Sequence, residues 1–318
     1  ATYCLDALWA ELKIEGVNEK YNGQPKTTSN AIIDINKGSE LDDEYKKQAD
    51  SLITKGEVYY SIDQNNWSTE KPSFTDAGTY TVYAKQDVTV GGVTTTLKAS
   101  AQVIINKRSV TLTSASDEKV YDGNALENKN VTVGGDGFVT GEGAAYDVTG
   151  TITDAGEADN TFTYTLNDNT KAANYTITKS EGKLKVTPVT SKVTVTVTGN
   201  TGSVAYDGKN HKVTGYTTSF SNGLYTATDF SFSGKAEASR TDAGKTAMGL
   251  KAEQFANTSK NFTNVEFEVT DGYSEVTKRS VTLTSASDSK TYDGNALENK
   301  NVTVGGDGFV TGEGAAYD

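Results

Sequence analysis

The residue types that most often perform catalysis are scarce in this chain. It has one histidine (His211), one cysteine (Cys4) and one methionine (Met248). A catalytic centre needs several groups that converge on one point, and a zinc site needs several Cys or His ligands. We therefore predict a protein that is not an enzyme and has no cofactor or zinc site. His211 follows a Tyr-Asp-Gly segment, which predicts a solvated loop position.

Calcium is the metal that the acidic residues could still bind. No loop of the Asp-x-Asp-x-Asp-Gly kind occurs. Calcium at an Asp-rich turn between repeats stays an open alternative. We predict no metal-binding residues.

Aromatic side chains are better candidates for binding, because rings present apolar surface with a polar edge. Tyr59, Tyr60 and Trp67 lie close together, and Tyr45 precedes them. On a strand, Tyr59 and Tyr60 would point to opposite faces. These four residues are the candidate binding site. The competing interpretation places most of them in the core of repeat 1. If a site exists, we expect it at the insertion of repeat 1, with Tyr59 directed outward.

The charge of the chain argues against two classes of partner. Its net charge is −12, and lysines and arginines form no block. Nucleic acid binding needs a basic face that displaces counterions, and no stretch is apolar enough to cross a bilayer. We therefore expect no nucleic acid partner and no membrane insertion. A single cysteine excludes a disulfide within the chain.

Internal repeats dominate the organisation of the sequence. Residues 278–318 copy residues 107–147, with differences only at Glu118/Ser289 and Val120/Thr291. Two short motifs mark further copies. The motifs are Tyr-x-Gly, beginning at Tyr21, Tyr121, Tyr206 and Tyr292, and Asp-Ala-Gly, beginning at Asp76, Asp154 and Asp242.

These motifs predict four repeats: repeat 1 (1–106), repeat 2 (107–188), repeat 3 (189–277) and the partial repeat 4 (278–318). Half a repeat would leave a bare sheet edge. We therefore expect the natural chain to continue past residue 318. No signal peptide or sorting signal is visible, which we interpret as removal or as an excerpt.

The local pattern predicts strands. Residues 193–198 alternate valine with threonine, and 110–113, 162–166 and 175–178 alternate in the same way. This period indicates half-buried antiparallel strands, and the breaks fall on turn residues such as 122–124 and 200–202. We predict an all-β chain of small immunoglobulin-like β-sandwich repeats in an elongated, monomeric array. The alternative is a β-grasp-like repeat.

Repeat 1 carries an insertion near residues 39–55. Its two motifs are 55 residues apart, against 33 in repeat 2 and 36 in repeat 3. Ser39 could cap a helix whose first turn is acidic and whose apolar side includes Leu41, Tyr45 and Leu52. We predict a short surface helix there.

The order of the motifs resembles the MBG and YDG-type repeats of Gram-positive bacterial surface proteins and adhesins. Repeat 2 carries Val120-Tyr121-Asp122-Gly123, Asp154-Ala155-Gly156 and Asn174-Tyr175-Thr176-Ile177. Repeat 1 carries Phe74-Thr75-Asp76-Ala77-Gly78-Thr79-Tyr80. Tyr80 would take the place of the corner tyrosine of immunoglobulin-like sandwiches, with its hydroxyl bonded back to the turn. The Tyr-x-Gly tyrosine would close the core edge.

The resemblance implies an extracellular protein at the bacterial cell surface or cell wall, with many such repeats in series. Proteins of this class sometimes carry isopeptide or ester cross-links, which sequence spacing cannot test. Residues 3–6 also resemble the cysteine motif of surface thioester domains. That chemistry would pair Cys4 with a glutamine, and Gln102, on a predicted strand, is a poor partner.

Two functions follow from these patterns. The first is a non-catalytic stalk or adhesin region of a secreted or wall-anchored protein. The second is a binding module for a host glycan or glycoprotein, including immunoglobulin, seated on repeat 1. Interchangeable repeats favour a spacer or multivalent weak binding, whereas the insertion sets repeat 1 apart.

Overall fold

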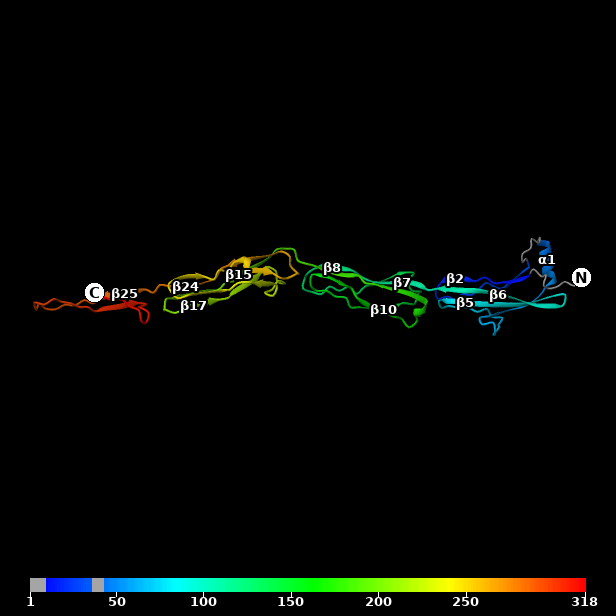
Figure 1. Ribbon diagram of the computed structural model, residues 1–318, viewed down its shortest axis with the longest axis horizontal. Coiled ribbons are helices and arrows are strands. Elements are labelled where there is room, and N and C mark those ends of the chain that lie inside the picture. Colours follow the sequence, from blue (N-terminus) through cyan, green and yellow to red (C-terminus); the bar gives the residue numbers. More distant parts are fainter. Residues whose placement is uncertain (1–9, 36–42) are drawn as a thin grey trace. The chain divides into compact units, whose positions relative to one another are not determined.

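The computed structural model describes residues 10–35 and 43–318, whose regular secondary structure is nearly all β-strand (Figure 1). The chain divides into two compact units. The first contains residues 1–117, 126–151 and 157–184, and the second contains 118–125, 152–156 and 185–318. The division passes through repeat 2. The predicted repeat boundaries are not tested by it and stay a prediction.

Repeat 1 is built on one four-stranded sheet in the order β2-β6-β5-β4, with the two-stranded ribbon β1-β3 beside it. The long hairpin β5–β6 is visible in Figure 1. The elements of repeat 1 are β1 (Glu11–Lys13), β2 (Val17–Lys20), β3 (Ile32–Asp34), α1 (Asp43–Leu52), β4 (Thr54–Ser61), β5 (Gly78–Val90) and β6 (Val93–Asn106).

The predicted helix is present as α1. Ser39 and Leu41, its expected cap and first apolar residue, lie outside the described residues. Leu52 is 70% exposed, which agrees with a surface helix. No helix in the described part of the chain has the length and apolar character needed to cross a membrane.

Repeat 2 begins and ends with strands that are each interrupted once. Its elements are β7 (Arg108–Ser114), β8 (Asp117–Val120), β9 (Val131–Gly135), β10 (Ala144–Val148), β11 (Gly156–Asp159), β12 (Phe162–Leu166), the 3₁₀ turn η2 (Ala172–Asn174), β13 (Tyr175–Ser180) and β14 (Lys183–Thr187). In the first compact unit, β7 pairs antiparallel with β9 and parallel with β13. Between β9 and β13 in the sequence, β10 and β12 pair with each other as an antiparallel ribbon.

Repeat 3 shows the same strand order in full. Its elements are β15 (Val193–Gly199), β16 (Thr201–Ala205), β17 (His211–Thr214), β18 (Tyr216–Phe220), β19 (Phe230–Phe232), β20 (Glu237–Arg240), β21 (Gly244–Ala247), the 3₁₀ turn η3 (Ala252–Gln254), β22 (Phe255–Asn257), β23 (Val265–Thr270) and β24 (Tyr273–Thr277). They form the sheets β18-β15-β23 and β16-β24-β21 and the ribbons β17-β20 and β19-β22.

The first strand of repeat 3 passes from one sheet to the other. The predicted turn at 200–202 is a single residue, Asn200, between β15 and β16, and Thr201 already pairs with Tyr273. The end of β15 lies so close to the turn between β23 and β24 that a Cβ added at Gly199 would be 2.3 Å from the amide nitrogen of Gly272. Glycine is therefore required at this crossing.

The core of repeat 3 explains the valine–threonine alternation. Val193, Val195 and Val197 are fully buried and pack with Tyr225, Phe255 and Phe262. The intervening threonines face outward and are half-buried or exposed. This is the expected pattern for a sheet with one face in the core.

These features confirm the all-β class, the tandem immunoglobulin-like sandwich repeats and the short helix inserted in the first. A β-grasp repeat packs a helix across its sheet. Repeats 2 and 3 have only the three-residue turns η2 and η3.

Repeat 4 consists of one hairpin, β25 (Val281–Ser285) and β26 (Val302–Gly306). In repeat 2 the equivalent leucine, Leu112, is fully buried beside the parallel strand β13, whereas Leu283 is 46% exposed. Nearly the same sequence thus has one buried and one partly exposed copy of this leucine among the described residues.

We predict that backbone amides exchange with solvent much more slowly in β7 than in β25. Exchange protection follows burial and local opening free energy, and Leu112 of β7 is fully buried whereas Leu283 of β25 is 46% exposed. Hydrogen exchange with mass spectrometry can separate the two copies on peptides that include 118–120 or 289–291, where the sequences differ. Equal protection in the two copies would contradict this account.

Candidate functional site

The four candidate aromatic residues separate into different environments. Tyr60 is 7% exposed and lies in the core, where its hydroxyl accepts a hydrogen bond from the Ala31 amide (3.1 Å). Tyr59 points outward from β4 and is 38% exposed, and Trp67 is half-buried. The side chain of Tyr45 lies outside what the structure describes. Tyr60 is therefore a core residue, and the outward direction of Tyr59 is confirmed.

Tyr59 and Trp67 are brought together by a lysine that the sequence pattern does not single out. The ammonium group of Lys85 lies 4.4 Å from the Trp67 ring centroid and 5.8 Å from the Tyr59 ring centroid. Lys85 is the residue directly opposite Tyr59 across β4 and β5. This cation–π cluster on the outer face of repeat 1 is the first candidate binding surface.

The residues considered for catalysis form no constellation. His211 begins β17 instead of lying in a loop, and its Nε2 is 2.7 Å from the Asp207 carboxylate. Cys4 lies outside the described residues, and Gln102 sits on β6 as predicted. Within residues 10–35 and 43–318, no group of three or more His, Cys, Asp or Glu side chains is placed to hold a metal ion.

The second candidate site is the junction between repeats 1 and 2, whose residues all belong to the first compact unit. Tyr21, of the first Tyr-x-Gly motif, is buried and packs edge-to-face on Tyr175, with ring centroids 5.7 Å apart. Both hydroxyls donate to the Glu142 carboxylate, Tyr21 to Oε1 and Tyr175 to Oε2 at 2.7 Å. Arg108 donates to the Tyr21 carbonyl at 3.2 Å. The tyrosine thus joins its repeat to the next one.

The environment of these phenols keeps them neutral. Burial, with the Glu142 carboxylate beside it, raises the pKa of Tyr21 to about 12. Burial likewise raises the pKa of Tyr175 to about 12. Both hydroxyls therefore stay protonated and able to donate hydrogen bonds at any physiological pH.

The Asp-Ala-Gly turn of repeat 1 faces an asparagine of repeat 2. Asn174 is fully buried; its Oδ1 accepts from the Ala77 amide at 2.7 Å, and its Nδ2 donates to Asp76 Oδ1 at 3.1 Å. Lys171 donates to Asp76 Oδ2 at 2.7 Å. Lys171 and then Asn174 lower the pKa of the Asp76 carboxyl. We call this set of contacts the Asp–Asn latch.

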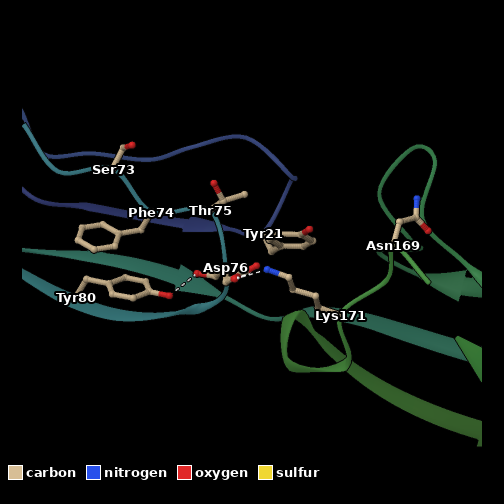
Figure 2. Close-up of a pocket in the computed structure, with 8 residues that line it drawn as sticks. All are labelled: Tyr21, Ser73, Phe74, Thr75, Asp76, Tyr80, Asn169 and Lys171. Carbon is tan, nitrogen blue, oxygen red and sulfur yellow. Dashed lines mark hydrogen bonds and ion pairs between the residues drawn. The ribbon is translucent and has the colours of Figure 1, made fainter. Parts of the chain in front are cut away.

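Tyr80 fixes the turn that carries the latch. Its hydroxyl donates to the Asp76 carbonyl at 3.0 Å, and its ring stacks on Phe74 at 4.1 Å (Figure 2). The predicted tyrosine corner is therefore confirmed. Because Tyr80 holds the backbone of Asp76, the carboxylate is already placed for Asn174 and Lys171.

A surface pocket of about 480 Å³ lies beside the latch, and Figure 2 shows its lining. Tyr21, Phe74 and Tyr80 supply its apolar surface, and Asp76 and Lys171 its charges. Both oxygens of Asp76 already accept hydrogen bonds, and Lys171 donates to one of them. These charged groups are occupied in holding the junction.

The latch recurs between repeats 2 and 3, in the second compact unit. Asn261 Oδ1 accepts from the Ala155 amide at 2.7 Å, and its Nδ2 donates to Asp154 Oδ1 at 3.1 Å. Lys260 lies 3.7 Å from Asp154. The tyrosine contact here is aromatic, since Tyr121 packs edge-to-face on Phe262 at 5.6 Å.

The tyrosine–glutamate contact recurs between repeats 3 and 4. Tyr206 donates to Glu313 at 2.6 Å, and Arg279 donates to the Tyr206 carbonyl at 3.1 Å. Gly208 adopts φ +76°, and a Cβ there would lie 3.4 Å from Val310. The geometry repeats that of Tyr21, Glu142 and Arg108, because repeats 2 and 4 present the same residues.

Sequence reasoning found one side of each junction and missed the other. The two motifs carry Asp76 and Tyr21, but their partners Asn174 and Glu142 lie about 100 residues away. One signal was available: an asparagine followed by an aromatic residue, as at Asn174-Tyr175 and Asn261-Phe262. The sequence predicts that the motif tyrosine closes the core edge of its own repeat. Tyr21 also contacts the following repeat, through Glu142 and Tyr175.

Comparison with known proteins gives no family for the chain. No family model matches it, and no curated protein matches. Among solved structures, the N-terminal eight Ig domains of Down Syndrome Cell Adhesion Molecule align at 10% identity with a TM-score of 0.19. The alignment covers 94% of this chain and 47% of the cell adhesion molecule chain, so this chain spans about half the length of that protein chain.

We predict that Asn174→Asp weakens the junction in a pH-dependent way. The new carboxylate cannot donate to Asp76, and the proximity of two carboxylates raises the pKa of one of them. A raised pKa means that stability is lost as pH rises. Relative to wild type, the loss should be about 1–3 kcal/mol at pH 7, and it should shrink towards pH 4.

Urea unfolding of the two proteins at pH 7 and pH 4 measures this difference. Asn22→Asp is the matched control, because Asn22 is exposed and its side chain accepts a hydrogen bond that a carboxylate could also accept. The other three Tyr-x-Gly motifs carry Asp at this position. We expect that control to stay within about 0.5 kcal/mol of wild type. A pH-independent loss in Asn174→Asp, or an equal loss in the control, would contradict the latch.

Proposed function

We propose that this chain is a non-catalytic stalk or adhesin region of a secreted or wall-anchored bacterial surface protein. The observation that carries the proposal is the recurrence of the junction contacts. The Asp–Asn latch joins repeats 1 and 2 and again repeats 2 and 3. A contact set built again at successive junctions serves the connection between repeats, which a spacer requires.

The junctions would resist bending for a physical reason. Asn174 of repeat 2 contacts repeat 1 at one point, and Tyr21 of repeat 1 contacts repeat 2 at another. The buried core is continuous from Val103 in repeat 1 to Val110 in repeat 2. Domains joined only by a flexible linker move freely by default. Here a hinge motion would break buried hydrogen bonds and expose aromatic surface, so the orientation of neighbouring repeats is held.

The junctions also have a direction. Each full repeat offers a Tyr-x-Gly and an Asp-Ala-Gly turn, and the following repeat supplies the partner. Asn261, for example, donates to Asp154 and accepts from the Ala155 amide. Head-to-tail contacts of this kind can be repeated from one repeat to the next. Repeats can therefore be added in series, which suits a structure that projects other modules away from a cell.

A location outside the cell is part of this proposal. The resemblance to MBG and YDG-type repeats of Gram-positive surface proteins supports it. A chain with one cysteine also forms its core without disulfides, as the burial of Val193 and Val195 illustrates.

A binding module on repeat 1 is the second candidate function, with a host glycan or glycoprotein, including immunoglobulin, as ligand. The cluster of Tyr59, Lys85 and Trp67 favours it, since it lies on the outer face of the sheet. A spacer and a binding surface are compatible within one chain.

The spacer proposal predicts a narrow distance distribution across the junction of repeats 1 and 2. Spin labels at Glu70 and Glu127, exposed positions in the first compact unit, would be placed in a Cys4→Ser background. Double electron–electron resonance should give one narrow peak. The same labels with Tyr21→Ala and Asn174→Ala should give a broader distribution, because both contacts are lost. A broad distribution in the parent chain would overturn the proposal.

A further inference from the structure

The outer face of repeat 1 carries an unusual cross-strand row. Tyr59, Lys85 and Lys98 lie directly opposite one another on β4, β5 and β6. Like charges in directly opposite positions destabilise a sheet. Among the described residues neither lysine forms an ion pair, although the chain carries 12 more acidic than basic groups. The acidic residue two positions along β5, Asp87, accepts a hydrogen bond from Thr96. Two ammonium groups without an ion-pair partner, beside aromatic rings, are features expected of a site for an anion.

The loop beside this row holds Trp67 in a fixed position. The amide of Tyr60 donates to the Ser68 carbonyl at 2.7 Å, and the amide of Ser68 donates back at 3.0 Å, which closes the loop. Inside it, the Asp63 carboxylate accepts from the amides of Asn65 and Asn66, both at 2.9 Å. Those amides lower the pKa of Asp63, so the loop stays bonded at neutral pH.

The same loop contains backbone strain. Gln64 has φ 64°, and it is the one non-glycine residue with positive φ in the described part of the chain. Its carbonyl accepts the indole N–H of Trp67 at 3.0 Å. A strained residue persists only where its surroundings impose it, and such residues cluster at ligand sites. The bond from its indole to the Gln64 carbonyl helps to hold the Trp67 ring beside Lys85.

We infer that Tyr59, Trp67, Lys85 and Lys98 form a binding surface for an anionic saccharide. The two ammonium groups would bond its carboxylate or sulfate groups, and the Tyr59 ring would contact an apolar sugar face. Neighbouring strands are about 4.8 Å apart, so the row spans about 10 Å over three strands. The row crosses the face of the sheet from β4 to β6, so a sugar chain lying on that face could contact all three side chains.

A second lysine–aromatic pair provides a matched control. Lys245 lies 3.3 Å from the Tyr273 ring centroid in repeat 3, but its cross-strand neighbour is Glu275. Lys245 also makes a cation–π contact, but a carboxylate lies beside it where Lys85 has a second lysine. This pair should therefore not bind anions.

The test is calorimetric titration of the whole chain with four saccharides: a uronic acid oligomer, a sialylated trisaccharide, a sulfated oligosaccharide and neutral lactose. We expect binding to anionic members only, weakened by salt. The saccharide that binds most tightly shows whether the site prefers carboxylate or sulfate groups. Lys85→Gln with Lys98→Gln should lower the affinity by roughly tenfold or more, and Tyr59→Ala should lower it too.

Lys245→Gln should leave the affinity unchanged. Thermal unfolding of the double lysine variant should match or exceed the parent, because a like-charge pair is removed. The inference is overturned if no anionic saccharide binds, if lactose binds equally well, or if a polyglutamate peptide binds equally well and competes. None of these outcomes depends on the spacer proposal, whose test is the distance distribution at the junction.

Discussion

The buried asparagine that bridges two repeats is the contact on which each latch depends. Asn174 satisfies the Ala77 amide and at the same time donates to the Asp76 carboxylate. A buried amide left without a partner costs more than a hydrogen bond contributes. Tyr80 holds the same turn from the other side. The turn, the asparagine and the corner tyrosine therefore form one cooperative network.

The latch is accompanied by an edge-to-face aromatic contact at both junctions, Tyr21 with Tyr175 and Tyr121 with Phe262, whereas the glutamate contact varies. Repeats 2 and 4 receive the preceding tyrosine through a glutamate, Glu142 and Glu313, whereas repeat 3 receives Tyr121 through Phe262. The near-identical repeats 2 and 4 thus bind the preceding tyrosine with the same residues, and repeat 3 binds it with different residues. Neighbours that differ in this way are less prone to mispair during folding.

Most of the fold could be predicted from the sequence, because strand alternation and repeat spacing are local signals. The valines of β15 and the corner role of Tyr80 followed directly. The break at Asn200 was predicted as a turn, because a strand that changes sheets carries the same glycine-rich signature. The pairing of Lys85 with Tyr59 and Lys98 depends on register, which a sequence without strand partners does not specify.

The most direct measurement of the central claim is a pair of double-mutant cycles. One combines Asp76→Ala with Asn174→Ala, and the other combines Asp154→Ala with Asn261→Ala, each scored by the free energy of unfolding. The latch predicts a favourable coupling at both junctions, about 0.5–3 kcal/mol, as found for residues that share one network. Additive effects at either junction would show that the two residues do not act together across the repeats, and would contradict the account.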